Sequence, residues 1–159
     1  MSKAAAPDDP FDLARFTQAQ EGVYAEALAE LGRAQKRSHW MWFVFPQIVG
    51  LGHSPTAVRY AIKSAAEARA YLGHPVLGPR LLACAETLLR LEGRSASAIF
   101  GSPDDVKLRS SMTLFAEVVG EAESVYGRVL DKYFDGERDV STLRILETLD
   151  DAGVRPPRS

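Results

Sequence analysis

The sequence predicts an all-α protein, a compact single-domain bundle of about seven helices. Apolar residues recur at spacings of three and four along most of the chain, which is the period of an amphipathic helix, and strand-like alternation is almost absent. Glycine, proline and serine mark the ends of these stretches. With 159 residues, 46% of them hydrophobic and 25% charged, the chain has the size and composition of one domain with a buried core.

The first half of the chain contains three helix signals. The first predicted helix ends near Gly32 and carries one apolar stripe: Phe16, Ala19, Val23, Ala27, Leu28 and Leu31. Ser54-Pro55 predicts the next start, because serine caps free amides and proline at the first helical position loses no hydrogen bond. Residues 64–67 have the capping-box pattern, and Gly73 predicts the end of that helix.

The second half predicts four more helices. The first spans residues 76–91 and is followed by Gly93. Ser102-Pro103-Asp104-Asp105 repeats the start signal, with carboxylates near the positive helix end. The apolar stripes behind these starts are Leu108, Met112, Phe115, Ala116 and Val119, then Val125, Val129, Leu130 and Phe134, then Leu143, Leu146 and Leu149 after Ser141.

Composition limits the classes of function. The domain is expected over residues 10–150, with disordered tails at 1–9 and 151–159. A net charge of −2 argues against general nucleic-acid or membrane binding. The single Cys84 excludes an intrachain disulfide, fits a reducing cytosol and is expected to pack in the core. We therefore expect a cytoplasmic protein. The three histidines have neither the spacing nor the cysteine partner of a zinc site, and we expect no metal and no cofactor.

The most unusual segment is KRSHWMWFVFPQIVGLGHS, residues 36–54. It contains both tryptophans and two of the three histidines. From residue 31 to residue 85 there are seven basic residues and one acidic residue, so this part carries a formal charge of +6 and the rest of the chain −8. Such a block predicts one wall of a binding site for a flat, anionic molecule. A short helix ending before Pro46, followed by a loop over 47–52, is the expected local structure.

Several residues of this block are candidates for the site. His39 follows two cations, which favour the neutral imidazole of a general base or hydrogen-bond partner; the alternative is a histidine that bonds a backbone carbonyl. Trp40 and Trp42 point in different directions on a helix, so one is expected to stack on a ligand and the other to fill the core. The loop adds Gln47, Gly50, Gly52 and Ser54, where glycines permit close approach and a helix start offers free amides.

A second candidate segment is DVKLRSSMTLF, residues 105–115. Lys107 is a candidate phosphate contact, as is Lys36 in the first block. Ser110, Ser111 and Thr113 are mediocre helix formers gathered within one turn, which suggests hydrogen bonds to a ligand or, alternatively, close packing against a neighbouring helix. The carboxylates near these motifs are Asp104, Asp105 and Glu67, and of these Asp105 is the candidate catalytic residue to act with His39.

These residues together resemble the uncharacterised, mostly bacterial domain-of-unknown-function family 1810. The residues that carry the resemblance are Phe16 to Gln20, Gly32, Lys36, Ser38 to Trp42, Phe45 to Gln47, Gly50 to Ser54, Tyr60, Tyr71-Leu72, His74-Pro75, Gly78, Arg80-Leu81, Phe100-Gly101, Asp104, Lys107 and Ser110 to Phe115. The resemblance implies a compact helical domain and no established activity. Some members carry a calpastatin label. Calpastatin inhibitory segments are disordered, whereas this chain is expected to fold, so we do not apply that label here.

At the level of the fold, the chain also looks like a distant relative of small helical hydrolases that act on ADP-ribose-linked compounds. The tryptophan-glycine and glutamate-asparagine motifs of that group are missing here. The resulting hypothesis is a pocket, built from the two segments, that binds a nucleotide-like or ADP-ribose-like anion. If the protein is an enzyme, the reaction class is hydrolysis of a glycosidic bond, which requires a carboxylate in the pocket.

The rival hypothesis is a protein-interaction module that uses the aromatic block as its anchor. A concave cleft lined by both segments favours the ligand, whereas a convex aromatic patch favours the partner. A third reading makes the block the core of a scaffold, with His39, Trp40 and Trp42 buried and no cavity beside them. The oligomeric state is left open by the sequence.

Overall fold

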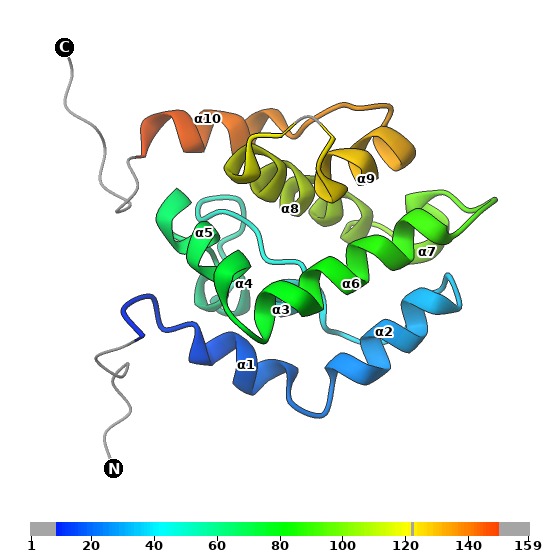
Figure 1. Ribbon diagram of the computed structural model, residues 1–159, viewed down its shortest axis with the longest axis horizontal. Helices are drawn as coiled ribbons and strands as arrows, with labels where there is room; N and C mark the ends of the chain where they lie inside the picture. Colours follow the sequence, from blue (N-terminus) through cyan, green and yellow to red (C-terminus); the bar gives the residue numbers. More distant parts are fainter. Residues whose placement is uncertain (1–8, 122, 150–159) are drawn as a thin grey trace.

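The computed structural model describes residues 9–121 and 123–149, and these residues form ten helices and no strands (Figure 1). The helices are α1 (Ala14–Gln20), α2 (Tyr24–Gly32), α3 (Met41–Val44), α4 (Pro55–Arg59), α5 (Ala65–Gly73), α6 (Leu77–Arg90), α7 (Ala96–Phe100), α8 (Asp104–Val119), α9 (Val125–Phe134) and α10 (Val140–Thr148). The all-α prediction is confirmed. The predicted tails lie outside the described residues, except for Asp9, whose carboxylate accepts hydrogen bonds from the N–H groups of Leu13 and Ala14.

The prediction of about seven helices was too low for three reasons. The first predicted helix is two helices, because Gly22 between them has φ = +74° and interrupts the helical backbone. The aromatic block contributes the four-residue α3, the short helix that was expected before Pro46 but was not among the seven. Helix α7 has only five residues and was missed, although Ser95 caps it by accepting a hydrogen bond from Ala98 N. Short helices of this kind carry too few apolar residues to show a period.

The predicted helix starts agree with the structure where serine acts as the cap. Ser54 Oγ accepts a hydrogen bond from Ala57 N at 3.1 Å, and Ser64 Oγ accepts one from Glu67 N at 3.0 Å. Helix α8 begins at the predicted position, but no side chain caps it, so Ser102 does not have the expected role.

Two helices organise the packing. Helix α6 contacts α2, α5 and α9, and helix α8 contacts α5, α7, α9 and α10. In Figure 1, α6 crosses the molecule between α1 and α2 on one side and α8, α9 and α10 on the other. Cys84 on α6 is fully buried, as predicted, and burial raises the pKa of its thiol to about 12. Among the described helices, none combines the length and the apolar character needed to cross a membrane.

A buried ion pair fixes the N-terminal helix α1 to the first turn of α5. Arg15 Nη2 lies 2.6 Å from Glu67 Oε2, and both side chains are almost completely buried. The same guanidinium donates to the carbonyls of Arg59 and Ala61, each at 2.8 Å. Glu67 Oε1 accepts a hydrogen bond from Lys63 N at 3.0 Å. Because both charges are compensated by several hydrogen bonds, this cluster holds α1 against the end of α4 and the start of α5.

The chain between α3 and α5 returns on itself. Ile48 and Ile62 form an isolated parallel bridge, and both are buried. Two backbone hydrogen bonds, from Val49 N to Ile62 O and from Ile62 N to Gln47 O, are each 2.8 Å long. The segment from Gln47 to Ile62, which includes α4, is therefore closed at its base by these bonds, and we call it the closed loop.

Candidate functional site

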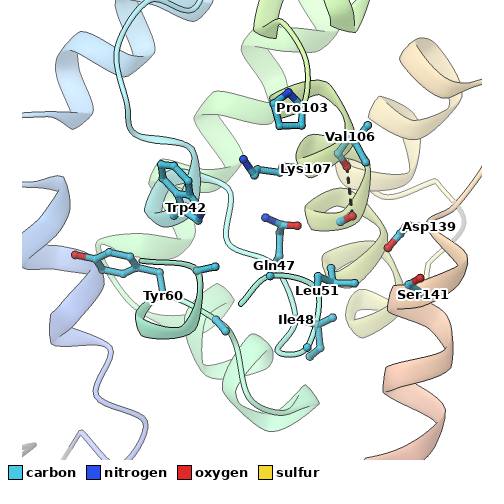
Figure 2. A pocket seen from close by; sticks show the side chains of 15 residues that line it. Trp42, Gln47, Ile48, Leu51, Tyr60, Pro103, Val106, Lys107, Asp139 and Ser141 are labelled. Atoms are coloured by element: carbon cyan, nitrogen blue, oxygen red, sulfur yellow. Dashed lines mark hydrogen bonds between the residues drawn. The ribbon is translucent and has the colours of Figure 1, made fainter. Parts of the chain in front are cut away.

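A pocket of about 250 Å³ lies between this closed loop and helices α8 and α10 (Figure 2). One wall comes from residues 42–61 and contains Trp42, Gln47, Ile48, Gly50, Leu51, Gly52, Ala57, Tyr60 and Ala61. The other wall contains Pro103, Val106, Lys107 and Ser110, completed by Asp139 and Ser141 at the start of α10. The two segments singled out in the sequence thus meet at one concave site.

The basic groups at the pocket share one carboxylate. Lys107 Nζ lies 4.7 Å from the centre of the Trp42 ring, a cation–π contact, and 3.2 Å from Asp104 Oδ1. Lys36 Nζ lies 2.8 Å from Asp104 Oδ2 and donates to the carbonyl of Ser38 at 2.6 Å. Two ammonium groups against one carboxylate leave one net positive charge. Of the two lysines, Lys107 lines the pocket, so it is the group that can meet an anion there.

Asp139 is the carboxylate that lines the pocket, and it is held firmly. Its Oδ2 accepts hydrogen bonds from the N–H of Thr142 at 3.1 Å and from the hydroxyl of Thr142 at 2.5 Å, so it caps α10. Its backbone N–H donates to Thr113 Oγ1 at 2.9 Å. Thr113 in turn donates to the carbonyl of Arg109 at 2.8 Å. Thr113 therefore positions Asp139 and has no contact with the pocket itself.

The two glycines of the loop are required by its geometry. Gly50 has φ = +100°, and a Cβ there would lie 3.3 Å from Ile145 Cδ1 on α10. A Cβ on Gly52 would lie 2.8 Å from the Cβ of Ala57, closer than real Cβ atoms pack. Gly50 thus lets the loop pass close to α10, and Gly52 lets the chain pass close to Ala57 on α4.

Buried Glu30 on α2 orders the chain that leads into this site. Its carboxylate accepts hydrogen bonds from Arg37 N at 2.8 Å, Ser38 N at 3.0 Å, Ser38 Oγ at 2.6 Å and Trp40 Nε1 at 2.9 Å. Burial alone would raise the pKa of Glu30, but the hydrogen bonds from Ser38, Arg37 and Trp40 together outweigh it and lower the pKa to about 2. The ionised carboxylate thus fixes residues 37–40, directly before α3.

The structure brings six of the sequence candidates to the pocket. They are Trp42, Gln47, Gly50, Gly52, Lys107 and Ser110. Of the two tryptophans, Trp42 lines the pocket, and Trp40 is fully buried with its indole N–H bound to Glu30. One core and one pocket tryptophan were expected, although Trp40 precedes α3 and does not lie on that helix.

The other candidates do not line this pocket. Lys36 pairs with Asp104, Ser54 caps α4, and Ser111 is fully buried. The two catalytic candidates also lie elsewhere. His39 is exposed on the segment before α3, and Asp105 lies in the first turn of α8, where its side chain accepts a hydrogen bond from Val106 N.

Sequence reasoning missed several residues of the site, above all Asp139, Ser141 and Tyr60. The last helix was placed after Ser141, whereas it begins at Val140 with Asp139 as its cap. An aspartate three residues before Thr142 was the available signal. Within residues 9–121 and 123–149, no three His, Cys, Asp or Glu side chains come together in a way that could hold a metal ion.

Known proteins are similar to this chain in sequence and in architecture. The family model described as "Protein of unknown function (DUF1810)" matches residues 10–146. The chain belongs to the DUF1810 family. A solved relative in structure is the conserved hypothetical protein Rv1873 from Mycobacterium tuberculosis, with a TM-score of 0.84 and 53% sequence identity. The match covers 87% of this DUF1810 member and 98% of the mycobacterial chain. None of the curated proteins compared with the sequence matches it.

Proposed function

We propose that this DUF1810 protein binds a small, anionic, nucleotide-like molecule in the pocket between the closed loop and helices α8 and α10. The observation that carries the proposal is the meeting of the two sequence segments at one concave site, where Lys107 is held by Trp42 and Asp104. The lysine supplies a positive charge in a partly enclosed pocket, and Gln47 and Ser110 supply polar groups around it.

The arrangement of the aromatic block favours this proposal over a protein-interaction module. Trp40, Met41, Val44 and Phe45 are buried in the core. Trp42 is half-buried, and it faces a pocket rather than a convex surface. An aromatic anchor for a protein partner needs exposed side chains, which this block does not offer.

The test is a thermal-shift screen of the purified protein against nucleotides, nucleotide sugars and ADP-ribose. A ligand at about 100 times its dissociation constant stabilises the fold by about 2.7 kcal/mol. For a domain of this size, that raises the melting temperature by roughly 5–10 °C. Lys107→Gln should abolish the shift, whereas Arg128→Gln, which removes an exposed cation on α9, should retain it. A screen in which no compound shifts the wild-type protein contradicts the proposal.

Hydrolysis of a glycosidic bond is a second candidate function, favoured by the carboxylate of Asp139 in the pocket. A carboxylate there is in place to activate water or to stabilise positive charge on the sugar. His39 and Asp105 have no part in this version, because neither lines the pocket. Incubation with ADP-ribosylated and nucleoside substrates, followed by chromatography for the released sugar, tests it. Product formation that persists in Asp139→Asn would contradict this role of the carboxylate.

A further inference from the structure

The lining of the pocket distinguishes between the parts of a nucleotide. Its volume of about 250 Å³ is below the roughly 300–1,000 Å³ of pockets that enclose a drug-sized ligand, so it holds only one part of such a molecule. Both aromatic rings in the lining are already engaged by the protein. Lys107 covers one face of Trp42, and the Tyr60 ring packs against Phe43 and Phe16 at centroid distances of 5.4 Å and 5.9 Å.

The polar groups, by contrast, are spread around the pocket. In Figure 2, Gln47 lies between Trp42 on one side and Asp139 and Ser141 on the other, with Lys107 close to the tryptophan. Lys107 and Asp139 form no ion pair with each other, since no nitrogen–oxygen distance within 4.0 Å joins these two residues. Two opposite charges are therefore held apart across one small cavity.

Asp139 also has an unused acceptor. Both hydrogen bonds from Thr142 go to Oδ2, and within the part of the chain that the structure describes Oδ1 has no donor. An ionised carboxylate oxygen accepts readily from hydroxyl groups, and a carboxylate that hydrogen-bonds a ribose hydroxyl is a recurrent way to recognise a nucleotide sugar. The fixed position of Asp139, set by Thr113 and Thr142, suits such a role.

From this arrangement we infer that the pocket recognises the sugar-phosphate part of its ligand, with Lys107 contacting the phosphate and Asp139 accepting hydrogen bonds from the sugar hydroxyls. The base lies outside the pocket. This inference rests on the proposed function and narrows it to one substrate class, phosphorylated sugars and nucleotides read through their ribose phosphate.

Four compounds test it by calorimetry with the full chain: ribose 5-phosphate, AMP, adenosine and inorganic phosphate. Ribose 5-phosphate and AMP should bind within about tenfold of each other, since the base adds little, and adenosine should bind at least about a hundredfold more weakly because it has no charge for Lys107. AMP that binds while ribose 5-phosphate does not would overturn the inference and leave the proposed function standing. Adenosine that binds as tightly as AMP would contradict both, because Lys107 would then contribute nothing. If none of the four binds, the inference fails, and the proposed function fails with it when the thermal-shift screen is also negative.

The variant Asp139→Asn separates recognition from structure. Asparagine caps a helix as well as aspartate does, so α10 should persist, but the amide group turned toward the pocket is then a donor. Loss of a hydrogen bond to a charged acceptor should weaken the binding of ribose 5-phosphate by about ten- to a hundredfold. Inorganic phosphate should bind equally well or more tightly, because a negative charge has been removed. Equal weakening of both ligands would indicate a merely structural role and would overturn the assignment.

Asp135→Asn is the matched control. Asp135 is exposed between α9 and α10 and has φ = +55°, a conformation that asparagine adopts readily. It removes the same charge a few residues away from Asp139 and does not touch the pocket. Both ligands should bind to this variant as they do to the wild type, and a loss of ribose 5-phosphate binding here would refute the specific role of Asp139.

Discussion

Replacing Glu30 by glutamine should destabilise the fold strongly and in a pH-dependent way. The carboxylate accepts four hydrogen bonds inside the protein, and its pKa is lowered from 4.5 to about 2. Each unit of pKa difference between the folded and unfolded states corresponds to about 1.36 kcal/mol, so the ionised form contributes about 3 kcal/mol at neutral pH. Glutamine imitates the uncharged carboxyl group, and its side-chain NH2 also faces the N–H and O–H groups that donate to Glu30 in the wild type.

The pH dependence has a definite sign. Because the folded pKa is depressed, the contribution of Glu30 is complete above the unfolded value of 4.5 and is lost as the pH falls toward 2. The difference in unfolding free energy between the wild type and Glu30→Gln should be about 3 kcal/mol at pH 7 and roughly half of that at pH 3. At pH 7 the variant should melt roughly 6–12 °C lower than the wild type.

Urea denaturation followed by tryptophan fluorescence measures this difference, since Trp40 donates its indole N–H to Glu30. The matched control is Glu26→Gln, which removes an exposed carboxylate from the same helix and should change stability by less than about 0.5 kcal/mol. A Glu30→Gln difference below about 1 kcal/mol at pH 7, or one that stays constant down to pH 3, would refute the reasoning.

Three further predictions concern the core. Arg15→Met should lower the unfolding free energy measured in urea by about 3–5 kcal/mol, because it leaves the buried carboxylate of Glu67 unpaired. Adding Glu67→Leu should recover part of that loss. A double variant less stable than the single one would contradict this. Gly78→Ala should destabilise the protein by about 1–3 kcal/mol, because the new Cβ would collide with backbone atoms of α5. The control Gly73→Ala has open space around it and should be neutral or up to about 1 kcal/mol stabilising. Equal melting temperatures of the two variants would argue against the clash. Because burial raises the pKa of Cys84 to about 12, its labelling by a thiol reagent at pH 8 should follow global unfolding, and rapid labelling of the folded protein would contradict its burial.

The fold class and the helix starts could be predicted because they depend on local chemistry. Serine caps at positions 54 and 64 act within three residues, and a sequence shows such contacts directly. The break at Gly22 was not predicted, because an apolar stripe continues across it and the period alone does not register a turn. Helix α7 was missed since five residues are too few to show a period.

Part of the candidate site could be predicted from the sequence, namely the two segments that form most of its lining. Trp42 and Lys107 were both selected for their chemistry, and the cation–π contact between them shows why segments so distant in sequence belong together. Asp139 escaped notice because its importance depends on where α10 packs against α8, a long-range property. His39 was chosen as a catalytic candidate because it follows two cations in the aromatic block. Its exposed position depends on a long-range contact, the hydrogen bonds that residues 37–40 donate to Glu30.

The bridge between Ile48 and Ile62 has a consequence for the thermodynamics of binding. Most of one pocket wall belongs to a loop whose two ends are joined by backbone hydrogen bonds and anchored by two buried isoleucines. The conformational entropy of that wall is therefore lost when the protein folds, not when a ligand arrives. Association should be rapid and limited by diffusion and orientation, and differences in affinity among ligands should appear mainly in how slowly they leave.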